Sequence, residues 1–148
     1  MKSKGNKSIL TPSLKQALGK MINDKIKIAI VDDSLAIRER LQQKIEKNND
    51  FEIIWTAEKL SGAMEEYLKE APEIMILDIQ LQDSSGFKVL ENIRKINSDT
   101  KIIMLTNFPY ATFKNKCMNL GGNYFFDKTN EFEKVFEVLK NFKNEKLN

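Results

Sequence analysis

Five short apolar runs alternate with segments of helical spacing from Lys25 onward, and this alternation constrains the fold more than any other feature of the sequence. The third run, Ile74–Leu77, is apolar throughout and leads directly into Asp78. A run without polar alternation is typical of a strand buried on both faces, as in a parallel sheet. Strands that alternate with helices imply right-handed crossovers and helices on both faces of the sheet. We therefore predict an α/β fold with a doubly wound parallel sheet, whose five strands lie at 26–31, 51–57, 74–77, 101–106 and 123–126.

The segments that follow the strands predict five helices. Ser34 is the expected N-cap of the first, and Pro109 is expected to open the fourth. The last helix should carry Phe132 and Leu139 on its apolar face, and the chain should then end in a solvated tail of lysines and asparagines.

The composition narrows the chemistry. With 148 residues, 41% of them hydrophobic and 30% charged, the chain has the balance of one soluble globular domain. No apolar run is long enough to span a membrane, and the single cysteine, Cys117, predicts a reducing, cytoplasmic location. The absence of histidine excludes histidine-based triads, histidine zinc sites and a phosphohistidine donor. Carboxylates, hydroxyls and lysines remain, and oxygen ligands suit a hard ion such as Mg²⁺.

The positive charge is concentrated at the N-terminus. Five of the lysines that give the net charge of +3 precede the first acidic residue, Asp24. Residues 1–24 are therefore expected to be a basic extension, either a tail or a short helix that begins at Thr11-Pro12, and residues 25–148 the folded domain.

Polar side chains end four of the predicted strands, and these are Asp32 with Asp33, Asp78, Thr106 and Lys128. In a parallel sheet these ends meet at one edge, where ligands bind. Two carboxylates about 4 Å apart repel by roughly 4 kcal/mol at an effective dielectric of about 20. Either some of them are protonated or a cation holds them, and a divalent ion is the simpler explanation. An ammonium and a hydroxyl opposite the cation would suit a phosphoryl group. The alternative, that each residue is an unrelated helix cap, would have to hold four times in register.

These residues resemble the motifs of response-regulator receiver domains, the CheY-like signalling proteins of two-component systems. The resemblance covers residues 25–142 and rests on the acidic pair, the aspartate after the third strand, the threonine, the lysine and Gly86. It implies a flavodoxin-like fold with strand order 2-1-3-4-5 and five helices.

The resemblance also implies a role for each site residue. Asp78 corresponds to the phosphoacceptor. Mg²⁺ would be held by Asp32, Asp33, Asp78 and the backbone carbonyl of Gln80, and the phosphoryl group by Thr106, the backbone N–H of Asn107 and Lys128. Thr106 and Phe125 correspond to the switch pair, and Gln80 and Phe108 to positions that tune the lifetime of the phosphorylated state.

The implied partners are proteins. The donor would be a sensor histidine kinase or a histidine phosphotransfer protein, and an unknown output protein, or a second copy in a homodimer, would bind the face formed by residues 109–140. Because only nine residues follow Leu139, we expect a stand-alone receiver. It should lose its own phosphoryl group slowly but not turn over outside substrates.

The sequence departs from the usual family pattern at four places around the site. Gln82 stands where proline is usual, and Asn107 replaces a small residue. Phe125 lacks the hydroxyl of the tyrosine that some members have, and Thr129 follows Lys128 where many members have proline. The first change predicts a less rigid phosphorylation loop, and the last leaves open whether the Lys128–Thr129 peptide is cis.

Other functions remain as alternatives. A nucleic-acid-associated regulator could use the basic extension, but five lysines without a recognition helix would give weak, nonspecific binding, so DNA binding is not expected. A phosphorelay intermediate would use the same site. An aspartate-dependent phosphatase would need a second aspartate at the position of Gln80.

Overall fold

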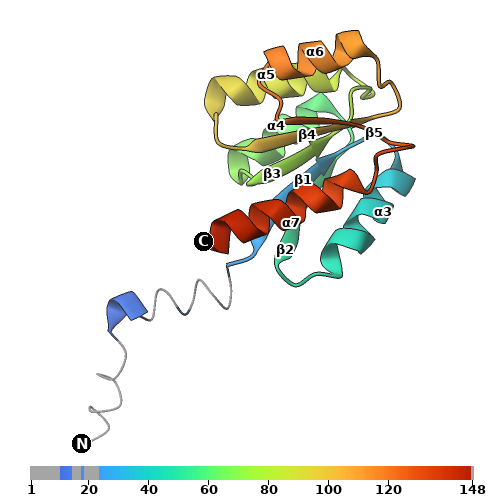
Figure 1. The fold of residues 1–148 in the computed structure, drawn as a ribbon. Helices are drawn as coiled ribbons and strands as arrows, with labels where there is room; N and C mark the ends of the chain where they lie inside the picture. Colours follow the sequence, from blue (N-terminus) through green and yellow to red (C-terminus); the bar gives the residue numbers. More distant parts are fainter. Residues whose placement is uncertain (1–10, 15–17, 19–23, 148) are drawn as a thin grey trace, which may run out of the picture.

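The computed structural model describes residues 11–14, 18 and 24–147, and its core is one five-stranded parallel sheet in the order β2-β1-β3-β4-β5 (Figure 1). The strands are β1 (Ile26–Val31), β2 (Phe51–Ala57), β3 (Ile74–Leu77), β4 (Lys101–Thr106) and β5 (Tyr124–Asp127). The helices that follow them are α3 (Leu35–Glu46), α4 (Leu60–Lys69), α5 (Gly86–Ile96), α6 (Ala111–Asn119) and α7 (Lys134–Leu147). The predicted doubly wound fold and its strand order are confirmed.

Two helical layers enclose the sheet. Helices α4, α5 and α6 cover one face, and α3 and α7 cover the other (Figure 1). Alternate residues of β3 pack on opposite faces of the sheet. Met75 and Leu77 lie in the core under α4–α6, and Ile74 and Ile76 lie in the core under α3 and α7. Full burial of such a side chain contributes about 1.5–3 kcal/mol. The uninterrupted apolar run in the sequence therefore reflects a strand that has no solvent face.

Most element boundaries follow the expectations, with three corrections. Ser34 caps α3 as predicted, because its hydroxyl accepts the Ile37 N–H at 3.3 Å. The fourth helix begins at Ala111 rather than at Pro109, because Tyr110 keeps an extended backbone. Strand β5 lies one residue later than predicted.

The expected C-terminal tail was the third error, because α7 continues to Leu147. Two lysines in its second half form ion pairs with loops at the amino edge of the sheet, Lys143 with Asp50 and Lys146 with Glu73. Phe142 packs against the core between α7 and the sheet. A segment that looks like a solvated tail in sequence is therefore held by contacts with distant parts of the chain.

Part of the N-terminal prediction lies outside the described residues, which do not include 1–10, 15–17 and 19–23. Within the described part, residues 12–14 are helical and the Leu14 N–H donates to the Thr11 hydroxyl at 3.1 Å, as expected for an N-cap. Among the described residues, no helix combines the length and the hydropathy that a membrane crossing requires. The described peptide bonds are all trans, including Lys128–Thr129.

Candidate functional site

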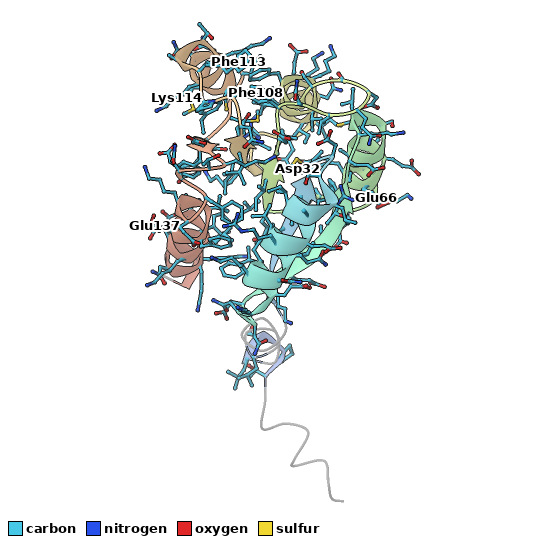
Figure 2. All side chains as sticks on the ribbon, turned by 90° about the vertical axis from the view of Figure 1, so that its right-hand side faces the viewer. Asp32, Glu66, Phe108, Phe113, Lys114 and Glu137 are labelled. Carbon is cyan, nitrogen blue, oxygen red and sulfur yellow. The ribbon has the colours of Figure 1, made fainter. Side chains whose placement is uncertain are left out.

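The structure brings the three predicted aspartates together at the carboxyl edge of the sheet. Asp32 follows β1 and Asp78 follows β3, and these strands are neighbours in which Val31 pairs with Leu77. One carboxylate oxygen from each of Asp32, Asp33 and Asp78 lies within 4.8 Å of the others. Asp32 and Asp78 are only 3% and 7% exposed, whereas Asp33 is exposed to solvent. Asp32 marks the middle of this edge in Figure 2.

Lys128 reaches this cluster from the far side of β4. Its Nζ lies 2.7 Å from Asp32 Oδ2 and 3.1 Å from Asp78 Oδ2, and its side chain is only 5% exposed. Burial lowers the pKa of this lysine, but the hydrogen bonds and charges of the two carboxylates outweigh burial and raise it above its usual value. The ammonium therefore stays charged and offsets part of the negative charge at the edge.

One ammonium shared by two carboxylates leaves Asp78 only partly compensated. Burial is the main cause that raises the pKa of Asp78, and the negative charge of Asp32 raises it further, while Lys128 and the Ile79 N–H act in the opposite direction. A second cation at the open side, next to Asp33, would relieve this imbalance. Three carboxylates converging from two loops are oxygen ligands of the kind that Mg²⁺ prefers, so the residues fit this ion.

The observed contacts do not support the interpretation of Asp78 as a helix cap. The residue at the N-cap of α5 is Ser85, not Asp78. The Asp78 carboxylate instead accepts the Ile79 N–H at 2.8 Å and the Lys128 ammonium. Asp78 is thus held at the strand end by its own loop and by Lys128, the residue that follows β5.

Gly86 permits the close approach of the loop that carries Asp78. A Cβ at Gly86 would overlap the backbone carbonyl oxygen of Asp78, and the Gly86 N–H donates to the Ile79 carbonyl at 2.6 Å. The loop from 78 to 86 therefore folds back tightly on itself, and only glycine fits at its end.

Thr106 and its neighbours complete the edge on the β4 side. The Thr106 side chain is fully buried, and its hydroxyl accepts the N–H of Phe108 at 3.0 Å. Asn107 is exposed between them. Phe108 is the first of a row of rings, since it lies against Tyr110, Tyr110 against Phe113, and Phe113 against Phe87. Figure 2 shows Phe108 and Phe113 on the α6 side of this edge.

The other predicted site residues lie around this edge. Phe125 is 8% exposed in the core between the sheet and α4–α6. Gln80 is exposed in the loop after β3, where it forms an isolated antiparallel bridge with Ser85.

Sequence reasoning missed Arg38, which contacts the backbone of Asp32 from α3. Its Nη1 donates to the Asp32 carbonyl at 2.6 Å, and its Nη2 lies 3.6 Å from a Glu58 carboxylate oxygen. The position of Arg38 one turn after the Ser34 cap was the available signal. Asp83, whose partners are 22 and 23 residues away, had no comparable signal in the local sequence.

Comparison with known families decides the identity of this arrangement. The family model described as the response regulator receiver domain matches residues 28–140. The chain belongs to this family. Receiver domains are the signalling domains of two-component systems rather than catalysts, and they imply a histidine kinase or another phosphodonor as a partner.

Individual relatives agree with this assignment. The receiver is 29% identical over 121 residues to the sensory transduction protein LytT of Bacillus anthracis. These aligned residues make up 82% of this chain and 48% of LytT. The chain thus spans about half the length of this curated relative. Among solved structures, a CheY-like receiver domain protein from Methanospirillum hungatei JF-1 has a TM-score of 0.70 at 26% identity, over 82% of this chain and 98% of that one. The CheX-CheY-BeF3-Mg²⁺ complex from Borrelia burgdorferi has a TM-score of 0.66 at 25% identity, over 77% of this chain and 89% of that one.

Proposed function

We propose that this receiver is a phosphorylation switch in which Asp78 accepts a phosphoryl group from a phosphohistidine of a sensor histidine kinase or phosphotransfer protein. A carboxylate oxygen of Asp78 would form the new O–P bond as the P–N bond of the donor breaks, and the electron pair of that bond would remain on the imidazole nitrogen. The observation that carries this proposal is the contact of one buried ammonium, Lys128, with both Asp32 and Asp78.

Asp32, Asp33, Asp78 and the Gln80 backbone carbonyl are the residues we propose as Mg²⁺ ligands. The bound ion would neutralise charge on the transferred group. The convergence of three carboxylates supports this assignment, as does the presence of Mg²⁺ in the complex of the Borrelia burgdorferi relative. The Asp32 carboxylate is oriented for this role by the Ser34 N–H, which donates to its Oδ1 at 2.9 Å.

Lys128, Thr106 and Asn107 would bind the phosphoryl oxygens. The Lys128 ammonium already lies against Asp78 and would transfer a hydrogen bond from the carboxylate to the new group. The Thr106 hydroxyl and the Asn107 N–H stand at the end of the adjacent strand. The Thr106 hydroxyl, which accepts the Phe108 N–H, still has its own proton to donate to the phosphoryl group. As Thr106 moves inward to do so, Phe125 would follow into the vacated space.

The outcome would be a population shift on the face formed by α6, β5 and α7. Phosphorylation adds up to about two negative charges at the end of β3, and these can favour one arrangement of Thr106 over another. Tyr124 and Phe126 stack on this face with ring centroids 5.9 Å apart, and Tyr124 is exposed. An output protein or a second copy of the chain would bind there. Gln80 and Phe108 flank the site and would set the lifetime of the phosphorylated state.

The experiment is the measurement of intact mass after incubation with acetyl phosphate, with and without Mg²⁺, on the wild type and on Asp78→Asn. We expect one added phosphoryl group that requires Mg²⁺ and is absent from the variant. Uptake by the variant, or no uptake by a wild type that binds Mg²⁺, would contradict the assignment of Asp78. A phosphorelay intermediate would further pass the group on to a histidine-containing protein, which the same assay detects when such a protein is added.

A further inference from the structure

The loop from residue 78 to residue 86 carries two of the proposed metal ligands, and its conformation is fixed mainly by its backbone. The Gly86 N–H donates to the Ile79 carbonyl, and the Leu81 N–H donates to the Ser84 carbonyl at 3.2 Å. Gln82, at the tip, lacks the fixed φ that a proline would give. The tip therefore depends on some other contact to hold its position.

Asp83 supplies a contact that joins this tip to a different element. Its carboxylate accepts the N–H of Leu60 at 2.7 Å and the N–H of Ser61 at 3.2 Å, which are the first two N–H groups of α4. These groups have no partner inside the helix, and the N-cap residue Lys59 offers no side-chain hydrogen bond. The hydrogen bond from Leu60 is the main cause that lowers the pKa of Asp83.

The start of α4 is also connected to the loop that carries the acidic pair. The Asp32 N–H donates to the carbonyl of Ala57 at 3.0 Å, and Glu58 pairs with the same Arg38 that holds the Asp32 carbonyl. Residues 57–61 therefore contact both loops that converge on the acidic cluster, one through Asp32 and the other through Asp83.

We propose that Asp83 is a positioning residue that fastens the phosphorylation loop to the N-terminus of α4 and so holds the Gln80 carbonyl and Asp78 in register with Asp32 and Asp33. This inference rests on the proposed function. Asp83 is not one of the proposed ligands of the metal or of the phosphoryl group. Its hydrogen bonds to α4 would hold the loop in place of the rigidity that a proline at Gln82 would give. Mg²⁺ affinity and the protection of the loop backbone should both depend on it.

The test separates the anchor from simple helix capping. Asp83→Ala removes both the anchor of the loop and the cap of α4. Asp83→Ala combined with Lys59→Ser restores a cap from within α4, because residue 59 has the extended conformation of an N-cap (φ −137°, ψ 157°), but it leaves the loop unanchored. Asp83→Asn keeps an oxygen acceptor and is the conservative variant. Asp99→Ala is the control for the loss of an exposed negative charge that does not contact the N-terminus of α4.

Two readouts are measured on each full-length variant, the Mg²⁺ dissociation constant by calorimetry and amide hydrogen exchange without Mg²⁺. We expect Asp83→Ala to weaken Mg²⁺ binding by about tenfold, the lower end of the range for residues that orient metal ligands. Amides at 60–64 and 79–86 should exchange faster. The double variant should regain protection at 60–64 only, and Asp99→Ala should resemble the wild type. Asp83→Asn should lie between the wild type and Asp83→Ala, because its single oxygen can replace only one of the two carboxylate oxygens that accept the Leu60 and Ser61 N–H groups.

Two results would contradict the proposed anchor. Recovery of Mg²⁺ affinity in the double variant would show that Asp83 is only a cap for α4, and unchanged exchange at 79–86 in Asp83→Ala would show that it anchors nothing. A wild type that binds no Mg²⁺ overturns the proposed function and the affinity effect together, and the anchor itself is then decided by the exchange data.

Discussion

Among single residues, Lys128 should contribute strongly to stability at the site, because its ammonium is shared by two buried carboxylates. Removal of one partner from a buried ion pair typically lowers stability by about 3–5 kcal/mol. We predict a loss of this size for Lys128→Met in urea unfolding at neutral pH without Mg²⁺. Lys134→Met is the matched control, because its pair with Glu131 is exposed and its loss should change little. Equal stability of the two variants would contradict the prediction.

In contrast to the loss of Lys128, neutralisation of Asp78 should raise the stability of the protein. Because burial and Asp32 raise its pKa, the fold disfavours the charged carboxylate, and the neutral Asp78→Asn variant should have a higher urea midpoint than the wild type at neutral pH. A group with a raised folded-state pKa stabilises the fold when it is protonated and loses that contribution as the pH rises through the folded-state value. The difference in urea midpoint between Asp78→Asn and the wild type should therefore disappear as the pH falls through the pKa of Asp78.

The control for this comparison is Asp99→Asn, because Asp99 is exposed. That variant also loses one negative charge, and its urea midpoint at neutral pH should stay close to that of the wild type. A lower midpoint for Asp78→Asn at neutral pH would mean that its contact with Lys128 outweighs the burial of the charge.

At Gly86, the addition of one methyl group should destabilise the protein. Its Cβ would overlap the Asp78 carbonyl oxygen, so Gly86→Ala should lower stability by about 1–3 kcal/mol, the range for overpacking, and should impair phosphoryl uptake. Gly62→Ala is the matched control, since its Cβ would meet only the Ala57 side chain at 3.8 Å. Because Gly62 lies inside α4, that change should stabilise the protein by about 0.5–1 kcal/mol. Denaturant unfolding and mass measurement of both variants check the opposite signs.

At the scale of elements, Thr106 connects the end of β4 to the loop before α6. Thr106→Val keeps the shape but removes the acceptor of the Phe108 N–H. We predict that this variant still takes up a phosphoryl group, whereas the change in hydrogen exchange of α6 and β5 on phosphorylation is lost. Thr100→Val is the control, because Thr100 is also buried but bonds to Tyr67 at the other end of β4. A full exchange response in Thr106→Val would exclude the hydroxyl as the switch.

The element boundaries show where local sequence is informative. The Ser34 cap and the apolar runs of the strands depend on neighbouring residues, so they were predicted correctly. The second half of α7 was not, because Lys143 and Lys146 look like solvent-exposed lysines until Asp50 and Glu73 are placed beside them. Similarly, α4 starts without a cap of its own, and its partner Asp83 comes from another loop.

At the scale of the whole molecule, the fold could be predicted because periodicity and strand-end chemistry agree. Parallel topology alone brings Asp32, Asp78, Thr106 and Lys128 to one edge, so their proximity followed from the sequence. Their individual contacts did not follow, since they depend on side-chain reach across neighbouring strands. Arg38 was missed although it lies one turn after the Ser34 cap, and the contacts of Asp83 with the start of α4 could be found only in the structure.

The strand order also has a consequence for how the molecule folds. β1 lies between β2 and β3, and β5 joins the sheet at its edge beyond β4. Before β5 is in place, the aspartates at the ends of β1 and β3 lack the ammonium of Lys128 and repel one another. We therefore expect docking of the last strand to be a late and electrostatically assisted step. A chain still emerging from the ribosome would therefore lack the ammonium of the proposed phosphorylation site until residue 128 is in place.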